Sequence, residues 1–456
     1  MTTVLKTPVH IPPSPKGHFI AGNLADYSHD PLGFLSDCTH QYGDIIRFRF
    51  GPLVSYMLNH PDYIEEVLVR KRSQFRRYLH ENGGERIFGN GLVTSEWDFW
   101  RQQRRMIQPA FHRERIAAYA DVMSAHTNRM LATWQPGEIR DIHQEMMYLA
   151  LTIVAKTFFD ADLTSEVEAI SKAVRVVVQQ FDENRGDNWF LLLLNSLLSK
   201  WLPTPQQLRF QKAAQQLDEI VYGIIHEHRN SGKDTGDLLS MLLHVQNSGD
   251  SQITDKQLRD ELMNLLLAGY DTTASALSWT WMLLSQNPVV EAKMLDELQA
   301  VLSGRVPTIA DLPQLRYTES VVMEAMRLYP PIWMVSLQAM EDCEIGEYSI
   351  PTGTLVFVSQ WVMHRDPRYF DNPEEFNPDR WADDLSKRLP TYAYLPFGGG
   401  PRVCIGRSFA MMEAVLVVAT IAQKYQLTLV SEHPTVPRPS ISLCPKYGMK
   451  MLLTKR

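Results

Sequence analysis

A glycine-rich loop with one cysteine offers the clearest chemistry in the sequence. Residues 397–406 read Phe-Gly-Gly-Gly-Pro-Arg-Val-Cys-Ile-Gly, and a helical pattern begins at about Arg407. Three consecutive glycines let the backbone approach something flat or large, and the N–H groups of a helix start favour a thiolate. A lone cysteine is more often a small buried hydrophobe. These surroundings instead predict that Cys404 is a metal ligand or a nucleophile.

The neighbours of Cys404 separate these two interpretations. A nucleophilic cysteine needs a positioned base, and no histidine stands near Cys404 in the sequence, although one could approach in space. Zinc would need several Cys or His ligands at short spacing, and the sequence has none there. Iron in a porphyrin needs only one protein ligand on this side, because the macrocycle supplies the ring nitrogens. One cysteine therefore suffices for haem.

The same loop resembles the haem-binding loop of the cytochrome P-450 family, F-x-x-G-x-R-x-C-x-G, at every fixed position. The resemblance implies haem b, with Cys404 as the axial thiolate and Arg402 as a propionate partner. It also implies that Phe397 packs near the sulfur. Gly400 and Gly406 fill the remaining fixed positions.

A second candidate motif, Ala-Gly-Tyr-Asp-Thr-Thr at residues 268–273, lies in the middle of a long helical pattern. Glycine costs about 1 kcal/mol inside a helix and threonine can divert a ladder hydrogen bond, so we expect a kink or a widened turn. Taken alone, the Asp-Thr pair would be a solvated face, but apolar flanks favour a buried helix. The stretch fits the family's [AG]-G-x-[DE]-T-[TS] motif. This implies that Asp271 and Thr272 deliver protons during oxygen activation.

Charged residues downstream have a structural interpretation. Glu324 and Arg327 stand at i and i+3 of an expected helix, and alone they would be an exposed ion pair. Their order relative to Pro330-Pro331 and to Arg380 is similar to the family's E-x-x-R helix and P-x-R element. The resemblance implies that Glu324, Arg327 and Arg380 form a buried triad that supports the haem loop.

A Trp-x-x-x-Arg pattern upstream resembles another family element. Trp100 and Arg104 fit it better than Trp97 and Arg101, and the resemblance implies that they contact a haem propionate. The alternative is a basic amphipathic helix face. One position departs from a common family pattern, because many members carry a propionate-binding arginine where this chain has Leu337.

Long elements must position these motifs. Thr254 is a candidate N-cap with Gln257 reaching back, and apolar periodicity continues to Asn287-Pro288, which predicts a helix of about 32 residues. We expect a second helix from Pro288 to Gly304 and a third over residues 315–328. Strand-like runs lie at residues 45–50, 54–58, 355–358 and 426–430.

Composition limits the class of protein. The chain has 456 residues, 45 basic and 52 acidic side chains and a net charge of −7, which argues against a nucleic-acid surface. Four scattered cysteines support no disulfide framework, and the first residues do not resemble a signal peptide, so we expect a reducing, cytoplasmic setting. The longest apolar run, residues 189–202, is too short to span a bilayer; we expect it to pack inside the protein or to touch a lipid surface.

We therefore expect a mainly α (α+β) fold over one domain, residues 1–456, with haem b, no zinc and no bound flavin. The resemblance implies a soluble, bacterial-type monooxygenase that uses O2. Without a fused reductase, electrons would come from a separate ferredoxin or flavodoxin. Such an acidic donor could dock on a group of arginines: Arg101, Arg104, Arg105, Arg113, Arg115 and Arg407.

The family's pocket-lining segments correspond to residues 76–93, 190–202, 333–335 and 440–443, whose apolar content favours a lipophilic substrate such as a fatty acid or terpenoid. Two alternatives remain open. One is a haem-thiolate enzyme that uses peroxide or does not activate O2, and the other is a non-catalytic haem protein that binds ligands.

Overall fold

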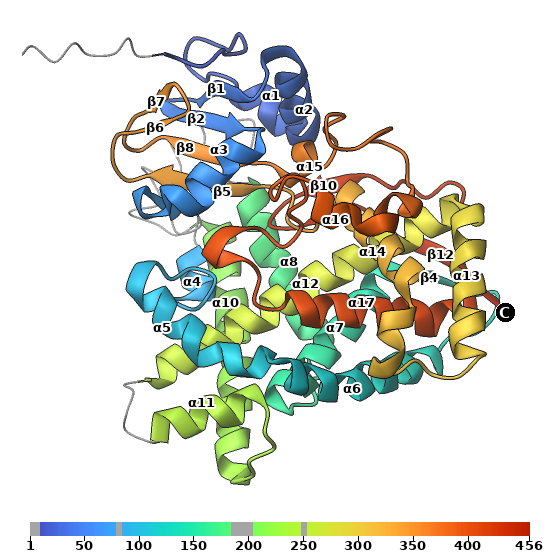
Figure 1. Ribbon diagram of the computed structural model, residues 1–456. Helices are drawn as coiled ribbons and strands as arrows, with labels where there is room; N and C mark the ends of the chain where they lie inside the picture. Colours follow the sequence, from blue (N-terminus) through green and yellow to red (C-terminus); the bar gives the residue numbers. More distant parts are fainter. Residues whose placement is uncertain (1–9, 79–83, 184–203, 248–252) are drawn as a thin grey trace, which may run out of the picture.

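The computed structural model describes residues 10–78, 84–183, 204–247 and 253–456. Within them the fold is mainly helical with several small sheets (Figure 1). The expected apolar run at residues 189–202 lies outside the described residues. The α-helices are α1 (Leu24–His29), α2 (Pro31–Tyr42), α3 (Pro61–Glu65), α4 (Gly84–Phe88), α5 (Trp97–Ile107), α6 (Arg113–Leu131), α7 (Ile142–Phe159), α8 (Val167–Glu183), α10 (Pro205–Ser231), α11 (Leu238–Asn247), α12 (Asp255–Gln286), α13 (Pro288–Leu302), α14 (Arg316–Leu328), α15 (Gln360–Met363), α16 (Leu385–Arg388) and α17 (Arg407–Ala422).

The largest sheet lies beside α1 and α2, at the upper left of Figure 1, and has the order β1-β2-β8-β5-β3. Its strands are β1 (Ile45–Phe50), β2 (Leu53–Leu58), β3 (Phe75–Arg77), β5 (Val335–Ala339) and β8 (Leu355–Val358). β2 and β8 are parallel, and the other neighbours are antiparallel. The sheet therefore joins the N-terminal part of the chain to a late segment.

Three smaller sheets complete the β structure of the described residues, with the orders β4-β12-β9, β6-β7 and β10-β11. Their strands are β4 (Ile139–Asp141), β6 (Cys343–Ile345), β7 (Tyr348–Ile350), β9 (Tyr425–Leu429), β10 (Pro437–Pro439), β11 (Leu443–Pro445) and β12 (Lys450–Lys455). The four expected strand regions are confirmed. The short strands β3 to β7 and β10 to β12 were not predicted, because three to six residues carry too little periodicity.

The long helix α12 has the predicted length of 32 residues. The Thr254 side chain accepts a hydrogen bond from the backbone N–H of Gln257 at 3.1 Å, as an N-cap should. The expected return contact is absent, since the Gln257 side chain donates to Glu261 and to the carbonyl of Asn90 instead. The helix after Pro288 ends at Leu302, slightly before the expected Gly304.

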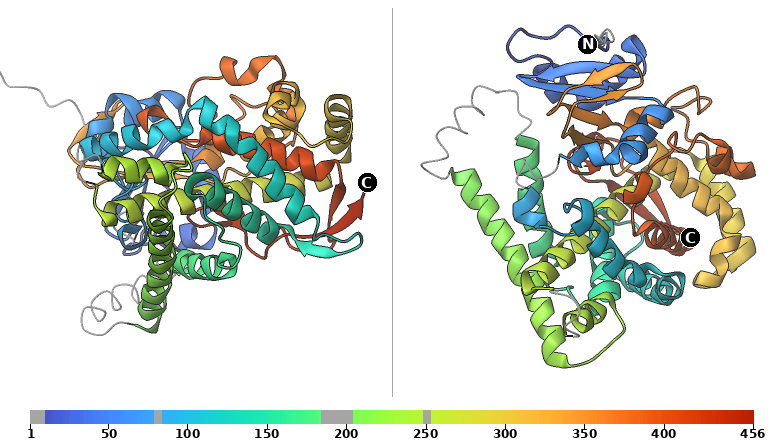
Figure 2. Two further views of the ribbon diagram at one scale, coloured as in Figure 1. Left: turned by 90° about the horizontal axis from the view of Figure 1, so that it is seen from below. Right: turned by 60° about the vertical axis from the view of Figure 1, so that its left-hand side comes forward.

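The core forms around α12, which crosses the molecule and packs against α7, α10, α14 and α17. Figure 2 shows this crossing from two further sides, with α10 along one edge of the helical part. Trp279 and Trp281 on α12 are among the largest fully buried side chains. No helix within the described ranges is long and apolar enough to cross a lipid bilayer.

Candidate functional site

The cysteine loop runs from Phe397 into α17. A short 3₁₀ turn, Gly400–Arg402, precedes Cys404, and the Cys404 N–H donates to the Phe397 carbonyl at 3.0 Å. Gly400 has a positive φ of 63°, and a Cβ there would lie 2.5 Å from the Leu68 carbonyl oxygen. Gly400 therefore lies directly against the backbone of Leu68.

Cys404 is exposed, whereas the other three cysteines are buried. Desolvation by the surrounding protein raises the pKa of its thiol, while the Gly406 N–H and the guanidinium groups of Arg104 and Arg77 lower it. Arg104 donates to the Val403 carbonyl at 2.8 Å, so its side chain reaches the cysteine loop. Positive charge and a backbone donor thus offset part of the desolvation that disfavours the thiolate form of Cys404.

Arg402 has an unpaired buried donor. Its Nη2 atom donates to the Ser95 carbonyl and to the Glu96 carboxylate, but its Nη1 atom is buried and has no partner among the described residues. The Trp100 ring lies close to two guanidinium groups, 4.8 Å from that of Arg402 and 4.7 Å from that of Arg72. Desolvation and neighbouring arginines lower the pKa of Arg402 to about 9. The Glu96 carboxylate raises this pKa but does not balance the neighbouring arginines, so positive charge is in excess around Arg402.

Arg77 is a site residue that the sequence reasoning missed. In the antiparallel register of β3 and β5, Arg77 stands directly opposite Leu337, and Arg76 stands opposite Gln338. Desolvation lowers the pKa of the Arg77 guanidinium, while the Glu96 carboxylate and Cys404 raise it. The neighbouring strand thus supplies an arginine across from the position where Leu337 cannot. Only the pairing of two distant segments reveals it.

On α12, the two candidate proton-transfer residues occupy different surroundings. The Thr272 hydroxyl donates to the Ala268 carbonyl at 2.7 Å, and the helix is α-helical throughout, so the expected widened turn is not seen. Burial raises the pKa of Asp271, while a hydrogen bond with Ser442 and the charge of Arg438 lower it. The carboxyl group of Asp271 therefore lies against the segment before β11.

The Glu324, Arg327 and Arg380 side chains meet in the core. Glu324 accepts hydrogen bonds from Arg327 and Arg380 at 2.9 Å. It also accepts from the Trp381 indole at 2.9 Å and from the Asn377 N–H at 3.1 Å. The Glu324–Arg327 pair is fully buried, so it is not the exposed pair that its spacing alone suggests.

The segment that leads into the cysteine loop is hydrogen-bonded to this cluster. The Leu395 N–H donates to His364 at 2.9 Å, and the Tyr394 hydroxyl donates to the Met323 carbonyl at 2.8 Å. Arg327 in turn donates to the His364 carbonyl at 2.9 Å. The triad and the loop are therefore joined through His364.

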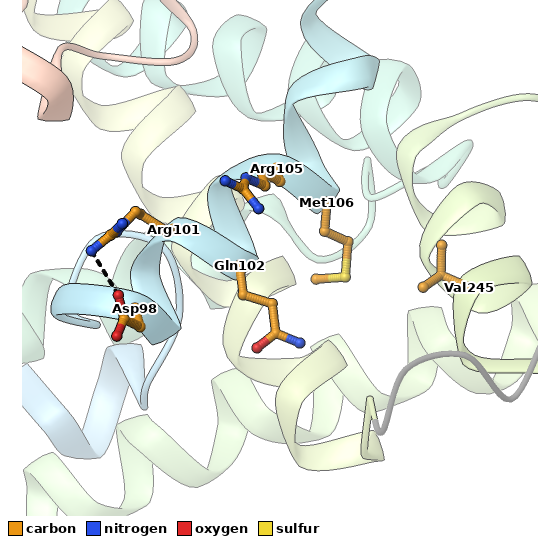
Figure 3. A pocket seen from close by; sticks show the side chains of 6 residues that line it. All are labelled: Asp98, Arg101, Gln102, Arg105, Met106 and Val245. Atoms are coloured by element: carbon orange, nitrogen blue, oxygen red, sulfur yellow. Dashed lines mark ion pairs between the residues drawn. The ribbon is translucent and has the colours of Figure 1, made fainter.

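A surface concavity of about 450 Å³ lies between α5 and α11 (Figure 3). Its lining residues are Asp98, Arg101, Gln102, Arg105, Met106 and Val245. Arg101 pairs with Asp98 at 2.7 Å. Of the expected docking arginines, Arg101 and Arg105 line this concavity, whereas Arg104 turns toward the cysteine loop.

The residues present fit a haem with two propionate groups. Arg72, Arg77 and Arg402 surround Glu96, and the unpaired Nη1 atom of Arg402 lacks the acceptor that a buried donor requires. A mainly helical α+β fold with one exposed cysteine in such surroundings suits a haem-thiolate protein.

Comparisons with known proteins agree. The family model for Cytochrome P450 matches residues 12–453. Cyclooctatin synthase from Streptomyces melanosporofaciens is 37% identical over 94% of this chain and 93% of its own length. Cyclooctat-9-en-7-ol 5-monooxygenase from the same organism is 36% identical over 87% and 85%. Pentalenene oxygenase from Streptomyces avermitilis is 30% identical over 96% of both chains.

The chain belongs to the cytochrome P450 family. It is a monooxygenase, an oxidoreductase whose cofactor is haem iron and whose reaction needs an organic substrate, O2 and a redox partner. The expected fold class, family and enzyme class are confirmed.

Proposed function

We propose that Cys404 is the axial thiolate ligand of haem iron and that the propionates are held by Arg77, Trp100, Arg104 and Arg402. The observation that carries this proposal is the buried, unpaired Nη1 atom of Arg402, two residues before the exposed cysteine. When bound, haem supplies the oxygen activation by which one oxygen atom enters the substrate. Residues 1–456 would form one functional domain.

Phe397 and Gly406 would shape the surroundings of the sulfur. Gly406 contributes a backbone hydrogen bond that lowers the Cys404 pKa, and Phe397 accepts the N–H of Cys404 at its carbonyl. The Arg407 guanidinium lies 5.9 Å from the Phe397 ring. The loop thus holds the thiolate in a donor-rich position.

Asp271 and Thr272 would move protons on the α12 side. The raised pKa of Asp271 lets its carboxyl group hold and release a proton closer to neutral pH than a solvated aspartate. The Thr272 hydroxyl, which now donates to the Ala268 carbonyl, can rotate to pass that proton on. Glu324, Arg327 and Arg380 would support the loop without entering the reaction.

The absorption spectrum of the reduced, carbon-monoxide-bound protein tests the ligand assignment. A thiolate ligand shifts the main band strongly to the red, and Cys404→Ala should remove that shift. Cys444→Ala is a matched control, because Cys444 is buried in β11. A thiolate-type band that survives in Cys404→Ala would overturn the assignment.

We further propose that the substrate is a cyclic terpenoid. The relatives named above include an oxygenase of pentalenene and a monooxygenase of cyclooctat-9-en-7-ol. The segments at residues 333–335 and 440–443 lie side by side, since the Trp333 indole donates to the Ser440 carbonyl at 2.9 Å. We expect pentalenene and cyclooctat-9-en-7-ol to shift the haem spectrum, with palmitate as the fatty-acid comparison. A shift with palmitate alone would contradict the terpenoid proposal.

The electron donor would be an acidic ferredoxin or flavodoxin that docks on the concavity of Figure 3. Arg101 and Arg105 supply positive charge there, and Met106 and Val245 supply apolar contact area. We also propose a reducing, cytoplasmic location, because the four cysteines form no disulfide bond with one another.

A further inference from the structure

The last residue of α4 and the segment that joins it to α5 (residues 88–96), called the α4–α5 connection below, are hydrogen-bonded to side chains of α12. Asp260 accepts the Asn90 N–H at 3.0 Å, and Glu261 accepts the Leu92 N–H at 3.0 Å. The next contact comes from Asn264, whose carbonyl oxygen accepts the Val93 N–H at 2.8 Å.

Asn264 also bonds the other end of the connection. Asp260, Glu261 and Asn264 are together called the clamp below. Its amide nitrogen donates to the Phe88 carbonyl at 2.6 Å, so the same side chain holds both ends of residues 88–93. Asn264 and Glu261 are fully buried, and Asp260 nearly so. The hydrogen bonds are therefore made to the backbone of the connection and not to its side chains.

Two glycines make this close approach possible. A Cβ on Gly89 would lie 2.0 Å from Asp260 Oδ1, and a Cβ on Gly91 would lie 2.4 Å from Asn264 Nδ2. Any side chain at either position would displace the α12 side chains. Gly89 and Gly91 therefore stand where Asp260 and Asn264 come closest to the backbone of the connection.

The far end of the connection reaches the cysteine loop. The Ser95 carbonyl and the Glu96 carboxylate accept hydrogen bonds from Arg402. The near end is bonded to Asn264, which lies one helical turn before Ala268 of the proton-transfer motif. Residues 88–96 thus span from the α12 side of the site to the cysteine side.

We infer that Asp260, Glu261 and Asn264 are positioning residues that hold the α4–α5 connection against α12 and so fix the wall of the substrate space. What this wall encloses rests on the proposed function, whereas the clamp itself does not. The three side chains touch neither substrate nor haem in this assignment; they act through the backbone that they hold.

Glu261 gives the clamp a pH dependence. Desolvation raises its pKa to about 8, the hydrogen bonds from Leu92 and Gln257 lower it, and Asp260 raises it further. The surrounding charged groups are already paired, Asp260 with Lys256 and Arg259, and Asp218 with Arg86 and Arg259. Since the folded-state pKa lies above the ordinary value, Glu261 is neutral below about pH 8. When the clamp opens, the carboxyl group ionises at its ordinary pKa of 4.5, so the clamp loses stability as pH rises from about 4.5 to about 8 and is not weakened further above that pH.

Hydrogen exchange of peptides covering residues 88–96 tests the clamp in the haem-loaded full chain. We expect Glu261→Leu to speed exchange there by at least about tenfold, because the Leu92 N–H loses its acceptor. Glu261→Gln keeps an acceptor and should exchange within about twofold of the wild type near pH 7. Asp255→Asn is the control on the same helix, because Asp255 pairs with Arg229 instead.

The pH profile and ligand binding complete the test. Between about pH 6 and about pH 8, exchange corrected for its intrinsic rate should rise in the wild type and level off above about pH 8, but it should not rise in Glu261→Gln. Cyclooctat-9-en-7-ol should bind Glu261→Leu at least about fivefold more weakly. Equal exchange in all variants would overturn the clamp. Faster exchange with unchanged ligand affinity would overturn its role at the substrate wall.

The clamp stays testable if one variant does not fold or if the ligand assignment fails. If Glu261→Leu does not fold, Gly91→Ala tests the neighbouring contact of the clamp, because its Cβ would displace Asn264 and should also speed exchange. If the protein lacks a thiolate-type spectrum, the proposed ligand assignment fails, yet the exchange measurement still decides the clamp.

Discussion

Replacing Glu324 by Gln should strongly destabilise the fold. The substitution keeps the size of the side chain but removes its charge, and it leaves the guanidinium groups of Arg327 and Arg380 without a carboxylate. Arg327 is fully buried, so water cannot solvate the uncompensated charge. The new amide group would also point N–H donors at a site filled with donors: Arg327, Arg380, the Asn377 N–H and the Trp381 indole.

Breaking a buried ion pair from one side costs about 3–5 kcal/mol. This corresponds to about two to four powers of ten in the unfolding equilibrium, a large part of the 5–15 kcal/mol typical of folded proteins. Equilibrium urea unfolding followed by circular dichroism measures it. We expect the midpoint to fall by about 1 M, since the urea dependence is steep for a chain of this size.

The matched control is the Asp384–Lys387 pair, which has the same i,i+3 spacing as Glu324–Arg327 but is exposed. Asp384→Asn should change the urea midpoint little, because exposed pairs contribute little. Adding Arg327→Met to Glu324→Gln should cost less than the two single changes summed, since it removes the stranded charge. Equal midpoints for Glu324→Gln and Asp384→Asn would refute the argument from burial.

Three further predictions concern pH, catalysis and docking. Burial lowers the pKa of His364 from 6.5 to about 3, so the unfolded state binds its proton first and stability should fall as pH drops from about 6.5 toward about 3. His364→Gln, which can still accept the Leu395 N–H, should flatten the pH dependence of the unfolding free energy from urea titrations by up to about 1.4 kcal/mol per pH unit; parallel curves would contradict this. Thr272→Ala should lower product formed per electron consumed by about tenfold or more, with Thr272→Ser close to the wild type; an unchanged yield in the Ala variant would remove Thr272 from proton delivery. Reduction by an acidic ferredoxin should slow as salt rises from about 50 to about 300 mM, and Arg101→Gln with Arg105→Gln should weaken that dependence; a salt-independent rate in the wild type would count against electrostatic docking.

Much of the site could be predicted from the order of residues along the chain. The cysteine loop is a short local pattern, and the start of α12 follows from Thr254, whose capping contact is three residues away. Helix length likewise follows from periodicity that continues to Pro288. Such features depend on neighbours in the sequence, so they need no knowledge of the fold.

Other features exist only because distant segments meet. Spacing alone made Glu324–Arg327 an ordinary surface pair, and burial turned it into the centre of a hydrogen-bond cluster. Arg77 stands opposite Leu337 through the register of β3 and β5, and Glu261 holds the Leu92 N–H across 169 positions of the chain. No local pattern encodes these contacts, because the same charged side chain is solvated, paired or clamped according to what packs against it. Tertiary packing decided which nitrogen of Arg402 is left without an acceptor and which backbone segment α12 holds.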